Sequence, residues 1–365
     1  MKKNVIIFMP SIEDGGVEKN LYEVSNYLVK NNINLEIVTC NNNMSFKFSK
    51  DIKFIGTKNS YWNNRSRYIK YIICLLILFL TLIKRKEKTL VFAFQANIYA
   101  VILAKILNVK IITRSNSAPP GWSQNAIKNF IYKFFIKFAN DVMVNSFEFK
   151  KIFEKKFGVK VKCIYNPFNK NFVLKKIKIK KKITFFKKGY LNIISVGRLT
   201  DQKDHLTLLR SIKELDSNFK VKVIIIGKGS TKDILKRYII KNNLQNKIKL
   251  FGYTNNPFPF IQKANMVVLT SKFEGLPNIL LEAQFLRKYI ISTNCPTGPK
   301  EILLNSKAGD LINIGDFKKL SHLIKNYSNN KNSIIKKINT GYKKFYRFDY
   351  MLNCKKYLNF IKNNY

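Results

Sequence analysis

The segment NMVVLTSKFEGLPNILLEAQ, residues 265–284, contains the whole pattern from which the fold of this chain can be predicted. Its first six residues form an apolar, valine-containing run, which is typical of a buried strand. Residues 271–275 read as a turn. Pro277 suits the first helical position, because its missing N–H needs no partner there. A buried strand, a short turn and a helix form a βα unit, the repeating element of a parallel sheet.

The same order of strand and helix repeats along the chain. Strands are expected at 4–8, 35–40, 52–56, 89–94, 109–113, 141–145 and 161–165, and helices near 17–30, 66–84, 96–107, 123–138 and 147–157. After a basic stretch the pattern restarts, with strands at 191–196, 221–227, 247–252, 265–270 and 288–293 and helices between them. The sequence therefore predicts an α/β protein with two doubly wound domains, in which a ligand binds at the carboxyl ends of the strands.

Length and composition fit this architecture. The chain has 365 residues, of which 46% are hydrophobic, enough for two cores. Its five cysteines are scattered and have no CxxC spacing, which argues against a disulfide framework or a zinc site and favours a reducing compartment. The first ten residues read as a short buried strand, so no secretory signal peptide is expected. With two histidines in the chain, Ser-His-Asp, Cys-His and His-metal chemistry are disfavoured.

The net charge of +46 suggests an anionic partner, although an A/T-biased genome would supply the same lysine-rich composition. The longest apolar run is YIICLLILFLTLI, residues 71–83. As a helix it would be roughly 20 Å long, short of the roughly 30 Å hydrocarbon core of a bilayer. A core or interfacial helix is therefore expected. Basic residues flank the run on both sides, so we expect shallow insertion into an anionic membrane surface.

Two glutamates mark the opening segment. Glu274 lies in the loop after the strand, and Glu282 lies about five residues, or roughly 7–8 Å of rise, into the helix. Two carboxylates so placed can hold separate hydroxyl groups of one long ligand. The helix N-terminus between them, near Leu276, Asn278 and Ile279, favours phosphate. A nucleotide-sugar has this layout of groups. Two surface glutamates on an ordinary helix, without any role in binding, would have the same spacing.

Two further loops contain candidate phosphate-binding groups. In SVGRLTDQKDHLTLLRSI, residues 195–212, Arg198 and Lys203 straddle the loop after a strand, where two cations can neutralise a diphosphate. A solvated basic loop would look similar. In FMPSIEDGGVEKN, residues 8–20, Gly15 and Gly16 would let the backbone approach a phosphate or sugar, or would simply form a tight turn. We expect His205, beside the first loop, to have a packing role.

Taken together, these segments resemble a known family. EGLPNILLE, with Glu274 and Glu282, resembles the paired-glutamate motif of the family-four retaining glycosyltransferases, which have the GT-B fold. The Gly-Gly pair, IYNP (164–167), SVGRLTDQKD (195–204) and GPKEIL (298–303) agree in order, so the similarity covers nearly the whole chain. It implies two facing Rossmann-like domains with a cleft between them. The expected divisions are an acceptor-binding domain at 1–170, a basic linker at 171–188, a nucleotide-sugar-binding domain at 189–345 and a final helix at 346–365 that packs back on the first domain.

The resemblance also implies an activity, the transfer of a sugar from a nucleotide-sugar with retention of anomeric configuration. No metal or other cofactor is implied, which fits the absence of Asp-x-Asp from the sequence. Glu274 would bind the donor sugar, Glu282 the ribose, and Arg198 with Lys203 the diphosphate; these two cations and Glu274 are the implied catalytic residues. The implied donor-binding residues are Gly15, Gly16, Arg198, Lys203, Gly252, Tyr253, Glu274, Gly275, Leu276, Asn278 and Glu282.

The chain departs from the family in one loop. Many relatives carry a histidine after the strand that matches 109–113, but here the sequence is TRSNSAPPGW, residues 113–122. Arg114 and Asn116 are therefore the acceptor-side candidates. The segment is similar to that of members acting on amino sugars of lipid-linked glycans. This similarity implies a UDP-linked N-acetylhexosamine as the donor and a glycan or lipid-linked acceptor in surface polysaccharide synthesis. We expect a cytoplasmic enzyme, peripheral on the inner face of the membrane.

Three other functions stay open at the level of sequence. A nucleotide-sugar 2-epimerase can have the same fold, but such enzymes use histidines in the cleft, and the two histidines here are poorly placed. A basic nucleic-acid-binding protein fits the charge, yet the sequence has no recognition motif or basic-aromatic platform, so no nucleic-acid partner is expected. An inactive scaffold subunit would not need Glu274, Glu282, Arg198 and Lys203 together.

Overall fold

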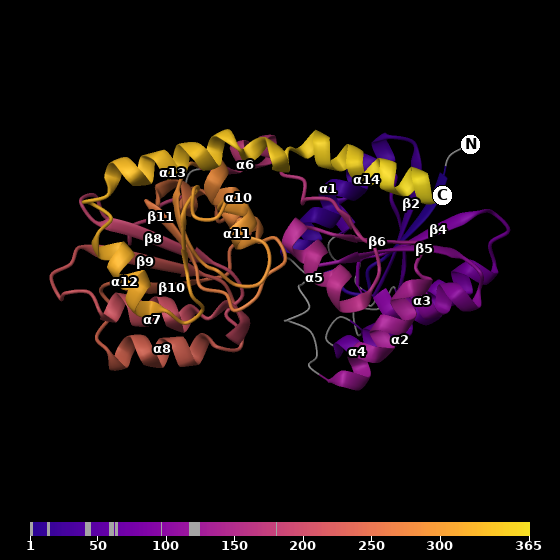
Figure 1. The fold of residues 1–365 in the computed structure, drawn as a ribbon, viewed down its shortest axis with the longest axis horizontal. Helices are drawn as coiled ribbons and strands as arrows, with labels where there is room; N and C mark the ends of the chain where they lie inside the picture. The colour runs from indigo at the N-terminus through magenta and orange to yellow at the C-terminus, as the bar shows by residue number, and fades with distance from the viewer. Residues whose placement is uncertain are drawn as a thin grey trace. The chain divides into compact units, whose positions relative to one another are not determined.

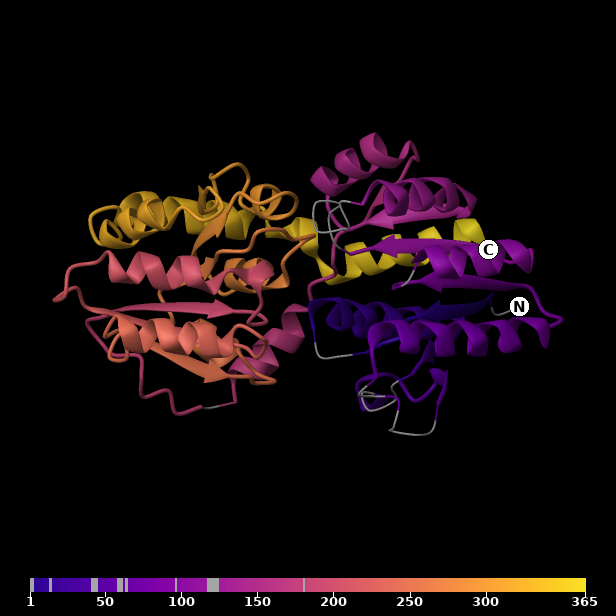
Figure 2. The ribbon, with the colours of Figure 1, turned by 90° about the horizontal axis from the view of Figure 1, so that it is seen from below.

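The computed structural model describes residues 3–12, 15–40, 45–57, 62, 65–95, 97–116, 125–179 and 181–365. The chain forms two compact units (Figures 1 and 2). Unit 1 consists of Met1–Pro167 together with Phe348–Tyr365, and unit 2 is the intervening segment Phe168–Arg347. Each unit is an α/β layer structure with its own parallel sheet and its own apolar core, as the repeated βα pattern predicts.

Unit 1 has a seven-stranded parallel sheet in the order β3-β2-β1-β4-β5-β6-β7. The strands are β1 (Lys3–Phe8), β2 (Ile33–Thr39), β3 (Lys53–Gly56), β4 (Thr89–Ala93), β5 (Lys110–Ser115), β6 (Asp141–Val144) and β7 (Lys162–Cys163). From β1 the successive strands are added first on one side, as β2 and β3, and then on the other, from β4 to β7, which is the doubly wound topology. Side chains alternate between the two faces of the sheet: Val5 and Ile7 belong to one core cluster, and Ile6 and Phe8 to the other.

The helices of unit 1 cover both faces of this sheet. They are α1 (Gly16–Lys30), α2 (Arg67–Ile83), α3 (Asn97–Ile106), α4 (Ala126–Phe135), α5 (Phe147–Phe157) and α14 (Tyr350–Asn364), with the short 3-10 helix η4 (Ile136–Phe138) after α4. α1 and α14 cover the face of Val5, and α2 and α3 cover the face of Ile6. Cys74, Leu78 and Leu82 of α2 follow a helical repeat of four, which is why this helix packs against the sheet along one stripe.

Unit 2 has a six-stranded parallel sheet in the order β10-β9-β8-β11-β12-β13. The strands are β8 (Leu191–Val196), β9 (Val221–Ile226), β10 (Ile248–Gly252), β11 (Met266–Leu269), β12 (Tyr289–Thr293) and β13 (Asp310–Ile312). The helices are α6 (Lys170–Ile177), α7 (His205–Lys213), α8 (Lys232–Lys241), α9 (Phe258–Lys263), α10 (Asn278–Phe285), α11 (Pro299–Ile302), α12 (Phe317–Lys325) and α13 (Lys331–Lys343), and the 3-10 helix η5 spans Asp201–Lys203. β8 pairs with β11, so the loops that follow these strands lie at the same sheet edge.

The expected linker at 171–188 lies within unit 2. The first crossing between units is at Pro167–Phe168, and α6 packs on α9, with Phe172 in ring contact with Phe258. The side chain of Asn256 also donates to the carbonyl of Lys176 at 2.9 Å. The sequence did not predict α6 because its lysines are typical of a solvated loop, yet Val173 of this helix is buried. The second crossing, at Arg347–Phe348, lies two residues after the expected position.

The apolar run at 71–83 lies inside α2, which has 17 residues. Within the described ranges, none of the helices combines the length and the apolar character needed to span a bilayer.

Candidate functional site

The loop after β8 carries the two expected cations and is held in place by a neighbouring loop. Arg198 follows directly after Gly197, and Lys203 ends η5. The backbone of Gly227 and Gly229, after β9, lies so close that a Cβ on Gly227 would be 1.8 Å from the carbonyl oxygen of Gly197. Gly229 also has a φ of +156°, where side chains are strained. The Gly-x-Gly of residues 227–229 thus has a packing role, which is to let the two loops touch.

The loop after β11 carries Glu274, which is buried with 8% exposure. α10 begins at Asn278, with Pro277 as the residue before it rather than the first helical residue as expected. Glu282 lies inside α10 and is also buried. The loop after β12 supports this segment: Thr297 Oγ1 donates to the carbonyl of Glu274 at 2.6 Å, and a Cβ on Gly298 would come within 2.4 Å of the Gly275 carbonyl oxygen.

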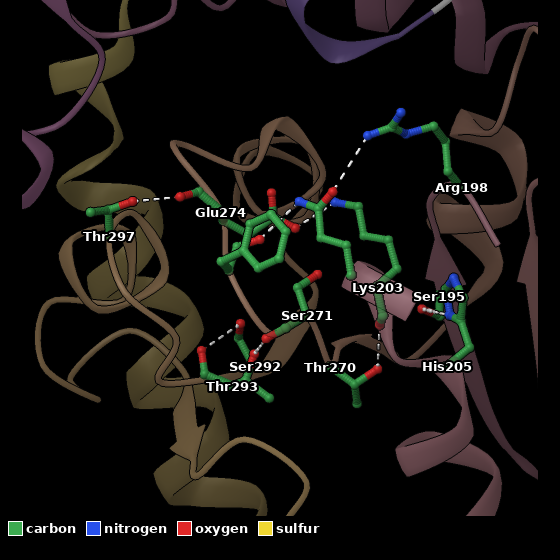
Figure 3. A network of polar contacts seen from close by, with 12 residues as sticks. Ser195, Arg198, Lys203, His205, Thr270, Ser271, Glu274, Ser292, Thr293 and Thr297 are labelled. Carbon is green, nitrogen blue, oxygen red and sulfur yellow. Dashed lines mark hydrogen bonds and ion pairs between the residues drawn. The ribbon is translucent and has the colours of Figure 1, made fainter. Parts of the chain in front are cut away.

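The two loops meet through an ion pair between Lys203 Nζ and Glu274 Oε1, drawn in Figure 3. The side chains are only 14% and 9% exposed, so their attraction is weakly screened by water. These residues are 71 positions apart in the sequence. Their contact follows from the neighbouring positions of β8 and β11 in the sheet. The structure therefore brings together a cation and a carboxylate that the sequence singled out separately.

Gln202 is a contact residue of this site that the sequence analysis missed. Its Nε2 donates to the carbonyl of Phe273 at 2.9 Å, and its Oε1 accepts a longer bond from Arg198 Nη2 at 3.4 Å. The backbone of Gln202 also accepts from the N–H of Lys272 at 2.8 Å. Lys272 Nζ pairs with Asp201 Oδ1 at 2.7 Å. Gln202 thus ties the loop of Arg198 to the loop of Glu274.

Two buried titratable side chains flank this site and are uncharged. The Nδ1 atom of His205 lies 3.3 Å from Ser195 Oγ (Figure 3). Burial, and secondarily the charge of Lys203, lower the pKa of His205 to about 4, so the ring is neutral at physiological pH, consistent with a packing role. Burial, and next the charge of Glu274, raise the pKa of the Cys295 thiol to about 12. Cys295 is therefore a neutral thiol and not an activated nucleophile.

Gly252 is the last residue of β10, the edge strand beyond β9, and Tyr253 follows it. Gly252 has a φ of +86°, and a Cβ there would meet no heavy atom within 4 Å. The Tyr253 side chain is 43% exposed, with Lys228 Nζ 5.1 Å from its ring centroid. An open backbone position beside an exposed aromatic ring can accommodate a planar ligand such as a base.

In unit 1, Gly15 precedes α1 and Gly16 is its first residue. Gly15 has extended backbone, and a Cβ on it would lie 2.7 Å from Glu18 Oε2. Any residue other than glycine here would therefore have to displace the Glu18 side chain. Residues 13 and 14, just before this pair, lie outside the described residues.

Arg114 and Asn116 lie at the carboxyl end of β5. Arg114 is 1% exposed; its Nη2 donates to Asn166 Oδ1 at 2.8 Å, and its guanidinium carbon lies 5.1 Å from the Phe94 ring centroid. Its Nε and Nη1 atoms make no hydrogen bond of normal geometry in the described part of the chain, although the guanidinium interacts with the buried Tyr357 hydroxyl and partly offsets the burial that raises the pKa of Tyr357. Asn116 donates to the Phe94 carbonyl at 2.8 Å, and its Oδ1 likewise has no described partner. Residues 117–122 of the quoted segment lie outside the described residues.

The groups that commonly hold metal ions do not gather in the described residues. No set of three or more histidine, cysteine, aspartate or glutamate side chains is close enough there to bind a metal ion. Between the loops after β8 and β11, Lys203 pairs with Glu274 and Lys272 with Asp201, and Gln202 links Arg198 to the Glu274 loop.

Two family models match the chain, one on each half. Residues 14–172 match the model described as Glycosyltransferase Family 4, and residues 176–344 match the model described as Glycosyl transferases group 1.

Curated relatives are similar to this chain to different extents. An uncharacterized glycosyltransferase of Methanocaldococcus jannaschii is 39% identical over 47% of this chain, but the match spans only 44% of that relative's length. A Campylobacter jejuni α-1,4-N-acetyl-D-galactosaminyltransferase, whose name specifies an undecaprenol-diphosphate-linked glycan, is 25% identical over 87% of this chain and 86% of its own length. A poly(ribitol-phosphate) α-N-acetylglucosaminyltransferase of Staphylococcus aureus is 31% identical over 36% of this chain and 28% of its own length.

Solved structures of low sequence identity share the fold over the whole chain. Anabaena HepE, solved in complex with UDP, has a TM-score of 0.79 at 16% identity and covers 99% of this chain and all of its own. Sucrose-phosphate synthase from Thermosynechococcus elongatus has a TM-score of 0.82 at 11% identity, with 99% of each chain covered. Together with the two parallel sheets, these likenesses confirm the predicted fold class, two Rossmann-like α/β domains of the GT-B kind.

Proposed function

We propose that this chain, which its two family models indicate to be a family 4-like glycosyltransferase of the GT-B fold, transfers an N-acetylhexosamine from a UDP-sugar to a glycan or lipid-linked acceptor. The transfer belongs to surface polysaccharide or glycoconjugate synthesis, proceeds with retention and needs no metal. Support for the amino sugar and the acceptor comes from the names of the Campylobacter and Staphylococcus relatives. Support for UDP comes from the HepE complexes with UDP and with UDP-glucose.

The observation that carries the proposal is the meeting of Lys203 and Glu274 at one edge of the unit 2 sheet. Without a donor, each of these buried charges is neutralised by the other, which lowers the cost of keeping both out of water. A bound donor offers each of them a new partner. The diphosphate would accept from Lys203 and Arg198, and a hydroxyl of the donor sugar would donate to Glu274. Glu282 would bind the ribose hydroxyls, and Gly15 and Gly16 of unit 1 would contact the phosphate.

These groups would act by position and charge. As the bond between the anomeric carbon and the phosphate oxygen breaks, negative charge grows on the diphosphate, and two fixed cations in a site of low exposure stabilise it. The acceptor hydroxyl forms the new bond to the anomeric carbon on the same face and passes its proton to the departing phosphate oxygen. No carboxylate nucleophile is needed in this scheme. The Cys295 thiol does not replace one, because its raised pKa keeps it protonated.

The acceptor would be bound by Arg114 and Asn116 of unit 1. Two nitrogen atoms of the Arg114 guanidinium and one oxygen atom of Asn116 make no hydrogen bond of normal geometry within the described residues, which leaves donors for a phosphate and an acceptor for a hydroxyl. A lipid-linked acceptor would place the enzyme at a membrane. We therefore propose peripheral association with the inner face of the cytoplasmic membrane.

The proposal is tested by binding and by turnover. A thermal-shift screen against UDP-, GDP- and ADP-sugars should show stabilisation by the UDP-sugars. Titration calorimetry should then show weaker UDP binding by Arg198→Ala than by the unchanged protein. Equal affinity of the two proteins would reject the role of Arg198, and stabilisation by another nucleotide alone would reject UDP.

A further inference from the structure

Helix α2 is apolar on the side that faces away from the sheet as well as on the side that packs against it. Cys74, Leu78 and Leu82 are buried, whereas Leu76 and Leu80 are 58% and 50% exposed. At 100° per residue, positions two apart lie on opposite sides of a helix, so the exposed leucines point outward. Tyr68, Ile72 and Ile83 extend this outer stripe and are 65%, 59% and 52% exposed. A soluble helix normally presents polar residues there.

Helix α4 and η4 present a second apolar stripe. No residue of α4 is buried. Ile127, Phe130, Ile131, Phe134 and Phe138 follow the spacing of one helical face and have exposed fractions of 70%, 71%, 42%, 52% and 38%. Tyr132, on the opposite side, packs against Phe153 and Phe157 of α5. The large apolar side chains of α4 therefore add little to the core of unit 1 and are available at its surface.

The two stripes belong to one side of unit 1. Figure 1 shows α2, α3 and α4 on the side of the sheet opposite α1 and α14. Tyr71 of α2 is in ring contact with Tyr99 of α3, and Lys105 Nζ of α3 lies 5.4 Å from the ring centroid of Phe138. We call the outer stripes of α2 and α4, together with the exposed side of α3 between them, the α2–α4 face.

The sequence around this face is almost free of negative charge. Residues 52–140 contain fifteen lysines and arginines and a single acidic residue, Glu87. Arg67 and Lys84 stand at the two ends of α2, and Lys128, Lys133 and Lys137 lie beside the apolar stripe of α4. All five are exposed. Protruding aromatic and aliphatic side chains among cations match the interfacial region of a bilayer with anionic headgroups.

We infer that the α2–α4 face is the surface by which unit 1 docks on an anionic lipid bilayer, with the side chains of both helices inserted among the headgroups. This inference rests on the proposed function in one respect: a lipid-linked acceptor requires such contact. It goes beyond the apolar run at 71–83, because α4 and η4 contribute five further exposed apolar side chains from a separate segment of the chain. Charge complementarity favours lipid over a second copy of this strongly basic chain, which would bring like charges together.

The test is co-sedimentation of the full chain with phosphatidylcholine vesicles, with and without phosphatidylglycerol. The chain should bind the phosphatidylglycerol vesicles, and added salt should weaken the binding because headgroup attraction is screened. The double variant Phe130→Ser/Phe134→Ser should bind at least about tenfold more weakly, since it loses two inserted rings. Ile234→Ser/Ile240→Ser on α8 of unit 2 is the matched control, because those side chains are 49% and 52% exposed, and it should bind as the unchanged chain does.

Equal vesicle binding by the α4 variant and the unchanged chain would overturn the inference, as would no binding by the unchanged chain. A concentration-dependent dimer that the α4 variant abolishes would identify a second copy as the occupant and would also overturn it. The variant should keep its circular dichroism and its UDP affinity, because Phe130 and Phe134 are exposed and lie outside unit 2. The proposed function is tested separately: it would be wrong if the unchanged chain did not bind UDP, whatever the result with vesicles.

Discussion

The ion pair of Lys203 and Glu274 allows a prediction that separates its structural role from its catalytic role. The perturbations are Lys203→Met, Glu274→Gln and the two combined. Each single change leaves one buried charge without its partner, whereas the double variant leaves none. The effects on stability should therefore not add, and the two single changes should differ in their effect on UDP binding.

The magnitude follows from the burial of the pair. Removing one partner of a fully buried ion pair costs about 3–5 kcal/mol. Lys203 is 14% exposed, so some water reaches the remaining charge. We therefore expect each single change to lower the free energy of unfolding of unit 2 by about 2 kcal/mol. The double variant should also lose about 2 kcal/mol, which gives a coupling energy of about 2 kcal/mol.

The assay must report on unit 2 alone. Both tryptophans, Trp62 and Trp122, belong to the sequence of unit 1, so tryptophan fluorescence follows the other unit. Hydrogen exchange of peptides that span β8 and β11 measures the opening free energy next to the pair. UDP binding by calorimetry supplies the second readout. Lys203→Met should weaken it by about tenfold or more, because a charge-assisted hydrogen bond is lost. Glu274→Gln should bind UDP at least as tightly as the unchanged chain, because Lys203 no longer pairs with a carboxylate, although transfer is lost.

Two results would refute this reasoning. Additive stability effects would mean that the two charges do not depend on each other. A loss of UDP affinity in Glu274→Gln as large as that in Lys203→Met would mean that the carboxylate holds the nucleotide and does not compete for Lys203.

Other predictions concern the residues around this pair and the acceptor side. Gln202→Ala should lower kcat/KM by about tenfold and weaken UDP binding, because Arg198 loses its link to the Glu274 loop, and unchanged kinetics with intact folding would reject this positioning role. Stability should fall by about 3 kcal/mol between pH 6.5 and pH 4, because the unfolded state takes up a proton on His205 that the folded state, with a pKa of about 4, does not. The pH dependence of denaturant unfolding should lose this component in His205→Gln, and an identical profile would count against it. Arg114→Met should raise the KM for the acceptor without changing UDP affinity, and an unchanged acceptor KM would remove Arg114 from the site.

The helix whose bounds were predicted best from the sequence has strong capping signals at both ends. Helix α5 occupies residues 147–157 as predicted. Ser146 Oγ accepts from the N–H of Phe149 at 3.2 Å at its start, and Gly158, with a φ of +68°, ends it. Helix α6 was missed because its lysines resembled a solvated loop, although Asn169 caps it. Strand β13 has only three residues, too few for a periodic pattern to appear.

The candidate site was predictable to the extent that it depends on the order of strands. Arg198, Lys203 and Glu274 each follow a strand, and the carboxyl ends of parallel strands share one edge. The ion pair between Lys203 and Glu274 itself could not be predicted from the sequence. Gln202 binds the backbone carbonyl of Phe273, a partner that no side-chain pattern reveals. Gly227 and Gly229 form a Gly-x-Gly after a strand, and a glycine needed for contact between loops has the same sequence signature as one needed for a ligand.

The return of α14 to unit 1 has a consequence for how the protein is made. Tyr357, Leu358, Phe360 and Ile361 complete the core cluster of unit 1, yet the ribosome adds them after all of Phe168–Arg347. Synthesis of unit 1 therefore starts first and is completed last. Unit 2 is an uninterrupted segment, so it can fold before the last helix of unit 1 has been synthesised. Expressed separately, a fragment of residues 168–347 should show cooperative unfolding, whereas residues 1–167 should do so only when a peptide of residues 348–365 is supplied.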